Sequence, residues 1–304
     1  MTSAIFPSAT ATRLWTALIT PLHADGRLDL NGLTQLLRAQ AQAGNGVVLL
    51  GSTGEGANLS ALERRAVLEH ACSLGLDLPI MAGVGGLELE TQRDWLMYCE
   101  DLPLAGYLMV TPLYAKPGAD GQRRWFETLM NAVRRPCMLY NVPSRTGVPL
   151  AEGALEGLRG HPNLWAVKEA GGNPERFAAY QARFPELAWY SGDDALFGEH
   201  ARLGAAGLVS VASNIWPQAV AEWVARCLAG DTALPGALLK AVAEPLFLAA
   251  NPIPAKALMH HIGEIASDAV RVPLSRADLA SLEPLLAAHA RVQQQFSREP
   301  ARAA

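Results

Sequence analysis

The sequence contains the stretch Asn163-Leu164-Trp165-Ala166-Val167-Lys168-Glu169-Ala170-Gly171-Gly172, an apolar run that ends at a single lysine. Because an unpaired buried charge is costly, the Lys168 side chain must reach water, pair with a carboxylate or lie in a site that tolerates it. Desolvation favours the free amine of a lysine, which is a nucleophile toward carbonyls, as Schiff-base enzymes require. Taken alone, this stretch favours the simpler interpretation, a strand that surfaces and pairs Lys168 with a carboxylate.

Eight short apolar runs, this one among them, alternate with longer amphipathic segments from Arg13 onward. The alternation is typical of βα units around a parallel sheet, and eight such units predict an α/β fold, a (β/α)8 TIM barrel. The predicted strands are residues 14–20, 46–50, 79–84, 106–110, 137–141, 164–168, 187–191 and 207–211.

Helices are predicted between the strands, for example at 30–43, 61–74, 92–101, 122–133 and 174–184. After Gly230 the strands stop, and three segments rich in Ala and Leu predict a C-terminal helical extension at 234–250, 255–262 and 276–295. We therefore expect a loose N-terminal leader at 1–12, the barrel at 13–229 and a helical region at 230–304.

The composition excludes several classes of protein. Hydrophobic residues make up 50% and charged residues 18% of the chain, which suits a globular fold with a large core. A net charge of -4 offers no broad basic surface for nucleic acid or an anionic membrane, and no apolar run reaches membrane-spanning length. The charge balance therefore favours a small-molecule partner. Four scattered cysteines without a CxxC spacing and the lack of a signal-peptide pattern predict a cytoplasmic protein.

The active sites of such barrels are built from the C-terminal ends of the strands and the loops that follow them. We expect the corresponding segments of this chain to meet Lys168 at one rim. They are Gly51-Ser-Thr-Gly-Glu-Gly56, Thr111-Pro-Leu-Tyr-Ala-Lys-Pro117, Tyr140-Asn-Val-Pro-Ser-Arg-Thr-Gly147 and Ser191-Gly-Asp-Asp194.

Each candidate residue on this rim also has a structural interpretation. Ser52 and Thr53 could complete a tight turn, or bind a small anion beside the flexible glycines. Tyr140 could be a core residue, or a proton relay beside an amine. Arg145 could be solvated, or could grip a substrate carboxylate through two hydrogen bonds. Tyr114 could be exposed, pack at a subunit contact or belong to the site.

Other kinds of chemistry find no support in the sequence. The seven histidines show no metal-ligand spacing, and the Gly-x-Ser-x-Gly elbow of serine hydrolases is missing. The loop at 51–56 lacks the Gly-Lys-[Ser/Thr] ending of a phosphate-binding loop. We expect a site that uses neither a metal nor a cofactor.

Together, five motifs resemble those of the dihydrodipicolinate synthase family, which belongs to the N-acetylneuraminate lyase superfamily. The resemblance extends from about Leu14 to the C-terminal helices, with the motifs in the family's order and spacing. The motifs are Gly51-Ser-Thr-Gly-Glu55, Tyr140-Asn-Val-Pro-Ser-Arg-Thr-Gly147, Val167-Lys-Glu-Ala170, Ser191-Gly-Asp-Asp194 and Asn251-Pro-Ile-Pro-Ala-Lys256. The last is expected to be architectural.

The resemblance implies a class I aldolase mechanism in which pyruvate forms an imine with Lys168. It implies that Tyr140 transfers protons, that Thr53 relays to it, and that Tyr114 is lent by a neighbouring subunit, so a homo-oligomer, a dimer of dimers, is expected. It also implies that Ser52, a threonine in most of the family, binds the pyruvate carboxylate together with Thr53. The other pocket residues that it implies are Val209, lining the imine pocket, and Gly192, near the second substrate.

The second substrate implied by the resemblance is L-aspartate 4-semialdehyde, because synthases of the family place an arginine at the position of Arg145. The product would be the hydroxylated cyclic precursor of diaminopimelate and lysine. Two alternatives stay open. The first is an N-acetylneuraminate lyase or keto-deoxy sugar acid aldolase with the same imine chemistry, and the second is a catalytically silent barrel that acts as a ligand sensor.

Feedback inhibition by lysine is expected to be weak or absent. The positions nearest to the family's feedback site carry side chains that offer little to an amino-acid ligand. These positions are Ala61, Arg64, Leu87 and Thr91.

Overall fold

Eight parallel strands close into a barrel in this computed structural model, which describes residues 9–298, with side chains to residue 295. Each strand pairs with its neighbours in the sequence, and β8 pairs with β1, so the sheet has no open edge. The predicted (β/α)8 barrel is confirmed. The strands are β1 (Leu14–Ala17), β2 (Gly46–Leu49), β3 (Ile80–Val84), β4 (Gly106–Val110), β5 (Cys137–Asn141), β6 (Leu164–Glu169), β7 (Ala188–Ser191) and β8 (Gly207–Ser210).

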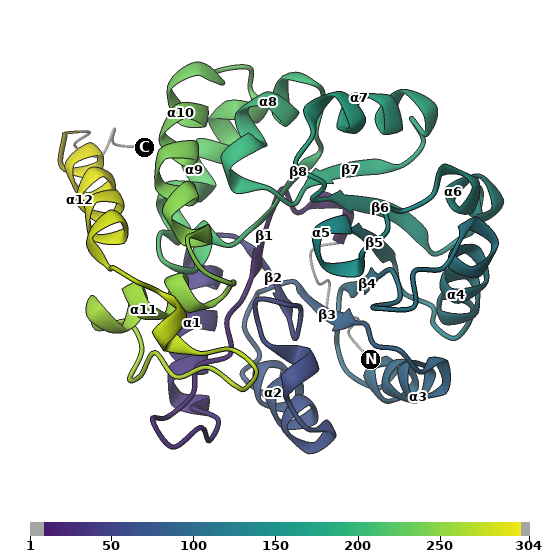
Figure 1. The fold of residues 1–304 in the computed structure, drawn as a ribbon, viewed down its shortest axis with the longest axis horizontal. Coiled ribbons are helices and arrows are strands. Elements are labelled where there is room, and N and C mark those ends of the chain that lie inside the picture. Colours follow the sequence, from purple (N-terminus) through teal and green to yellow (C-terminus); the bar gives the residue numbers. More distant parts are fainter. Residues whose placement is uncertain (1–8, 299–304) are drawn as a thin grey trace.

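Helices form a ring around the strands (Figure 1). Several begin at side-chain caps, such as Asp29, which accepts a hydrogen bond from the Gly32 amide, and Ser60, which forms a capping box with Glu63. The helices are α1 (Leu30–Gln42), α2 (Ala61–Ser73), α3 (Leu89–Glu100), α4 (Ala119–Asn131), α5 (Pro143–Thr146), α6 (Glu152–Leu158), α7 (Pro174–Arg183), α8 (Phe197–Arg202), α9 (Pro217–Leu228), α10 (Ala233–Ala243), α11 (Ile253–His261) and α12 (Glu283–Arg298).

Two of the predicted C-terminal helices are shorter than expected. The segment 234–250 is not one helix, because α10 ends at Ala243 and a 3-10 turn, Glu244–Phe247, follows. Pro245 lacks the amide hydrogen that a continuing α-helix needs. The segment 276–295 is likewise divided, since α12 begins only at Glu283, whose amide donates to the Ser281 hydroxyl.

Two packed layers make up the core. Side chains that point into the barrel form one layer, and Trp15, Met81, Met138 and Tyr190 are completely buried there. The other layer lies between the strands and the surrounding helices. Because the barrel is filled with side chains, a reactant has room only at its mouth.

The remaining segments are the N-terminal turn, which contacts the barrel interior, and the C-terminal helices, which pack beside the ring of helices. Of the predicted leader, residues 1–8 lie outside the described residues, while Ala9–Ala11 forms a 3-10 turn and the Thr12 carbonyl accepts a hydrogen bond from the Tyr190 hydroxyl at 2.8 Å. The helix α10 packs against α8, α9 and α12. The predicted boundary near residue 230 stays a prediction. Within residues 9–298, no helix has the length and apolar character to cross a membrane.

Candidate active site

Lys168 lies near the C-terminal end of β6, on the face that points into the barrel. The strand register places it between Tyr140 of β5 and Tyr190 of β7. The residue is only 5% exposed, and its Nζ lies 4.2 Å from the centroid of the Tyr140 ring, within cation–π distance. No carboxylate of the described residues forms an ion pair with it. The interpretation of Lys168 as a surfacing, ion-paired residue is therefore wrong.

The other lysines of the chain are in different surroundings. The chain has four lysines, all within the described part of the structure, and Lys116 and Lys240 are exposed. Lys256 is buried, but it pairs with Glu55 at 2.5 Å. Lys168 is thus the one lysine that combines burial, a place at the barrel mouth and freedom from an ion pair.

Gly192, just after β7, provides the space that the Lys168 side chain occupies. A Cβ atom at this position would lie 2.7 Å from Cε and 3.1 Å from Cγ of Lys168, and 2.6 Å from Cβ of Ala170. These separations are too short for carbon atoms in contact. Position 192 must therefore be a glycine if the Lys168 side chain is to keep this conformation.

Gly192→Ala is expected to lower kcat by about 100-fold, because the new methyl group displaces the Lys168 amine by around an ångström from its working position. Steady-state kinetics of the variant check this prediction. Gly118→Ala is a suitable comparison, since nothing lies within 4 Å of a Cβ atom there and its φ of -72° suits any side chain. Equal activity of Gly192→Ala and the wild type would show that the Lys168 side chain does not need the space left by the glycine.

Three carboxyl groups lie at or just after the C-terminal ends of β6 and β7, on the same rim as Lys168. The Asp193 carboxyl accepts a hydrogen bond from the Gly172 amide at 3.1 Å, and burial raises its pKa to about 6, against the opposing effects of that bond and of the Lys168 ammonium. Asp194 is buried and accepts from the Val211 amide at 2.8 Å. Glu169 accepts from the Asn141 side-chain amide at 2.5 Å, and burial raises its pKa.

Asp193→Asn is expected to be more stable than the wild type at neutral pH. The pKa of the carboxyl rises from 3.8 to about 6 on folding, so between these values the native state holds a proton that the unfolded chain has lost. The wild type therefore loses stability relative to the variant as the pH rises from about 4 to about 6, and the difference is constant above that. Urea unfolding of both proteins at several pH values measures it. A difference that does not change with pH would contradict the assignment.

The loop after β2 holds Thr53 in a buried position. Two residues that flank the threonine, Leu50 and Glu55, adopt left-handed backbone conformations with φ of 61° and 54°. A Cβ atom at Gly56 would lie 2.1 Å from the Leu50 carbonyl oxygen, so the loop folds tightly on itself. Thr53 is 3% exposed, and its hydroxyl accepts a hydrogen bond from the side chain of Asn251 at 2.8 Å.

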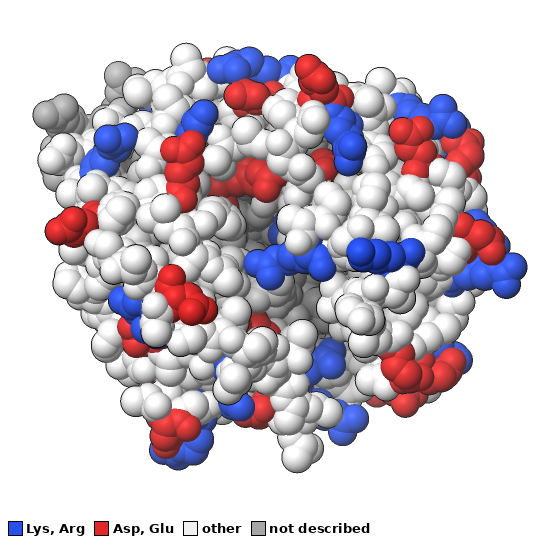
Figure 2. Space-filling view, in the orientation of Figure 1, with Lys and Arg blue, Asp and Glu red and all other residues white. Residues whose placement is uncertain are grey.

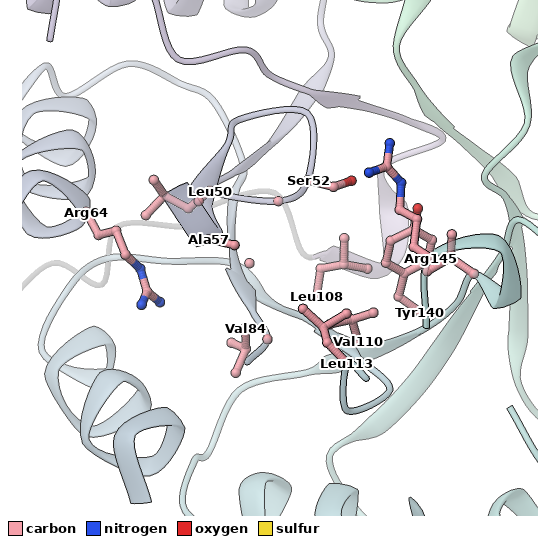
Figure 3. A pocket seen from close by; sticks show the side chains of 15 residues that line it. Leu50, Ser52, Ala57, Arg64, Val84, Leu108, Val110, Leu113, Tyr140 and Arg145 are labelled. Atoms are coloured by element: carbon pink, nitrogen blue, oxygen red, sulfur yellow. The ribbon is translucent and has the colours of Figure 1, made fainter. Parts of the chain in front are cut away.

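An open cleft lies above the barrel mouth. Ser52, Tyr140 and Arg145 line it together with apolar side chains such as Leu108 and Val110 (Figure 3). Figure 2 shows the same face of the molecule hollowed near its centre, with both basic and acidic side chains at the edge of the hollow. A small substrate with an apolar part and a carboxylate suits this lining.

The structure brings most of the predicted site residues together. Lys168, Tyr140 and Gly192 meet at the mouth, and Ser52 and Arg145 share the cleft with Tyr140. Val209, completely buried, belongs to the same interior cluster as Tyr140.

Two of the implied relay contacts are not formed within this chain. Thr53 and Tyr140 are not joined by a hydrogen bond in this structure, and the threonine hydroxyl accepts one from Asn251. Tyr114 is 88% exposed and its backbone is left-handed, with φ of 64°. No group of His, Cys, Asp and Glu side chains in residues 9–295 is arranged to hold a metal ion.

The sequence interpretation did not select Asp193 or Asn251 as site residues. An acidic pair directly after a strand was a signal for Asp193, since it lies at the same rim as Lys168. Nothing local pointed to a contact between Asn251 and Thr53, which are separated by 198 residues.

A closed barrel with a buried, unpaired lysine at its C-terminal mouth defines an enzyme of the class I aldolase type. Comparison with known proteins agrees with this class. The sequence matches the Dihydrodipicolinate synthetase family over residues 10–291, and the chain belongs to that family.

Individual relatives are similar over nearly their whole length. The chain is 46% identical to the 4-hydroxy-tetrahydrodipicolinate synthase of Francisella philomiragia, covering 94% of this chain and 97% of the relative. Among solved structures, that of the same enzyme from Methylacidiphilum fumariolicum SolV is 30% identical with a TM-score of 0.89, and the alignment covers 94% and 97% of the two chains. The chloride-inhibited dihydrodipicolinate synthase of Acinetobacter baumannii, complexed with pyruvate, is 33% identical with a TM-score of 0.87, over 93% and 99%.

Proposed function

We propose that the chain catalyses the 4-hydroxy-tetrahydrodipicolinate synthase reaction, the condensation of pyruvate with L-aspartate 4-semialdehyde in the diaminopimelate and lysine pathway. The observation that carries the proposal is the buried Lys168, free of any ion pair and 4.2 Å from the Tyr140 ring, in a chain that belongs to the family. A silent barrel would have no need to keep an unpaired lysine in so costly a position.

The reaction begins when the Lys168 amine attacks the carbonyl carbon of pyruvate, and loss of water gives an imine. Loss of a proton from the methyl carbon then yields an enamine. This carbon attacks the aldehyde of the second substrate, whose oxygen takes up a proton. The amino group of the bound product next attacks the imine carbon, which closes the ring and releases the Lys168 amine.

The residues around the cleft have separate tasks in this sequence of steps. Tyr140, packed against the amine, carries protons to and from the reacting carbon and oxygen atoms. Ser52 and Thr53 bind the pyruvate carboxylate, and Gly192 leaves room for the lysine. Arg145 at the cleft edge binds the carboxylate of the semialdehyde, since a guanidinium matches a carboxylate through two parallel hydrogen bonds.

Tyr114 is proposed to complete the proton relay in a neighbouring subunit. Its ring is 88% exposed in the single chain, in a loop that leaves the barrel mouth, which suits a residue that packs against a second copy. We propose a homo-oligomer, a dimer of dimers, in which this contact forms. A cytoplasmic location fits the four free cysteines.

Borohydride trapping tests the proposed function. Pyruvate and borohydride together are expected to leave a stable mass adduct on the peptide that contains Lys168, and on none of the other three lysines. Turnover of pyruvate with aspartate semialdehyde is then compared with cleavage of sialic acid and keto-deoxygluconate. An adduct with cleavage of a sugar acid but no condensation would favour the lyase alternative, and the lack of an adduct would favour the silent barrel.

Inhibition by free lysine is expected to be weak, with less than half inhibition at 1 mM, a concentration on the order of common metabolite levels. The Arg64 guanidinium lies 4.0 Å above the Trp95 ring, the Thr91 hydroxyl donates to Glu88, and Leu87 is exposed. None of these groups offers a free carboxylate to the amino groups of lysine. A lysine titration of the initial rate checks this expectation.

A further inference from the structure

The C-terminal region reaches back into the barrel mouth through one side chain. Asn251, which precedes α11, donates its side-chain amide to the Thr53 hydroxyl at 2.8 Å. Both residues are buried, with exposures of 6% and 3%. A segment that the sequence marks as architectural thus contacts a residue of the proposed catalytic machinery.

The other half of the Asn251 amide has no partner. Its Oδ1 atom is buried and accepts no hydrogen bond from any of the described residues. A buried acceptor without a partner destabilises a fold, because it loses its hydrogen bonds to water. The Asn251 side chain therefore adds little to the stability of the fold, and its one hydrogen bond is with Thr53.

Asn214 shows how a structural asparagine is used in the same barrel. It is also buried, and both halves of its amide are bonded: Oδ1 accepts from the Ile19 amide at 2.9 Å, and Nδ2 donates to the Ala17 carbonyl at 2.8 Å. Asn214 thus forms hydrogen bonds with backbone groups on both sides of its amide, whereas Asn251 forms one hydrogen bond, with the Thr53 hydroxyl.

The direction of the hydrogen bond decides what Thr53 can do. A hydroxyl has one proton to donate and two lone pairs to accept with. Because Asn251 donates to the oxygen, the proton of Thr53 stays available for another acceptor. No other hydrogen bond to this hydroxyl forms within the described residues, so its proton is not taken by another group of this chain.

The backbone on either side of Thr53 is anchored as well. The Thr20 hydroxyl donates to the Gly54 carbonyl at 2.7 Å, and the Glu55 carboxylate accepts from Lys256 at 2.5 Å and from the Arg271 amide at 2.7 Å. Two of these three contacts again come from the C-terminal region. With the backbone fixed, the side-chain torsion that places the Thr53 oxygen is the freedom that remains, and the hydrogen bond from Asn251 restricts it.

We infer that Asn251 is a positioning residue of the active site, which orients the Thr53 hydroxyl so that its proton is presented to the reacting groups. The inference rests on the proposed function and adds to it a residue from outside the barrel. Asn251 acts through Thr53 alone and touches neither substrate.

A double-mutant cycle tests the inference. The variants Asn251→Ala, Thr53→Val and the combination are assayed for kcat and pyruvate KM, with Asn214→Ala as the matched control. Thr53→Val is expected to lower kcat by about 100-fold and Asn251→Ala by about 10-fold, the effect of one neutral hydrogen bond. In the Thr53→Val background, Asn251→Ala is expected to have no further effect on kcat.

Thermal unfolding of the same variants separates positioning from support of the fold. Asn251→Ala is expected to keep the wild-type midpoint, whereas Asn214→Ala, which breaks bonds on both sides of its amide, lowers it. The inference would be overturned if the effects of Asn251→Ala and Thr53→Val on kcat multiplied in the double variant. It would also be overturned if the unfolding midpoint of Asn251→Ala fell as far as that of Asn214→Ala. In either case, turnover by the wild type would leave the proposed function intact. A wild type that forms no pyruvate adduct would overturn both.

Discussion

Lys168→Ala is expected to lower kcat for the condensation by about 1,000-fold or more and to abolish the borohydride-stable pyruvate adduct. The covalent intermediate cannot form without the amine, and removal of a nucleophile is among the most damaging changes in an active site. The KM for pyruvate should change much less, since the proposed contacts of Ser52 and Thr53 with its carboxylate remain. Initial rates and mass spectrometry of trapped protein measure the two effects.

Lys116→Ala is the matched control for this change, because that lysine is exposed in the loop after β4. It should retain the adduct. Lys168→Arg keeps the positive charge beside Asp193 but cannot form an imine, so it separates loss of the nucleophile from loss of charge. An adduct that persists in Lys168→Ala would assign the imine to another lysine and would contradict the proposed mechanism.

The barrel was predictable because its strands repeat one simple pattern. Each apolar run is buried and is followed by an amphipathic helix, so the periodicity of the sequence marks both. Lys168 stood out for the same reason, as a charge at the end of a buried strand, and its register beside Tyr140 follows once the strands are placed in order. The end of a strand can be predicted from the residues next to it in the sequence.

The C-terminal contacts were not predictable in this way. The bond from Asn251 to Thr53 and the ion pair of Lys256 with Glu55 join residues about 200 positions apart, and no periodicity encodes which side chains meet across such a distance. The exposure of Tyr114 is a related case, because the neighbouring subunit that we propose as its partner is not part of its own chain. The extent of α10 was missed for a local reason, the proline at position 245.

Lys256→Met is expected to destabilise the protein by about 3–5 kcal/mol, the largest stability effect that we expect from a single substitution in this chain. The Lys256 side chain is fully buried, and its Nζ donates to Glu55 at 2.5 Å and to the Ala269 carbonyl at 2.9 Å. Methionine fills a similar volume, but it leaves the Glu55 carboxylate buried without its counter-charge. Urea unfolding of the variant and of the wild type measures the difference.

Two further variants make this measurement specific. Lys240→Met removes an exposed lysine whose nearest carboxylate, on Glu244, is 4.0 Å away, and surface pairs of this kind contribute at most about 1 kcal/mol. The double variant Glu55→Gln with Lys256→Met should recover part of the lost stability, because the unpaired charge is gone and the Gln oxygen can still accept from the Arg271 amide. If Lys256→Met were no less stable than Lys240→Met, the ion pair would not be what fastens the C-terminal region to the loop of Thr53. The contacts of Asn251, Arg271 and Thr20 would then have to hold the loop.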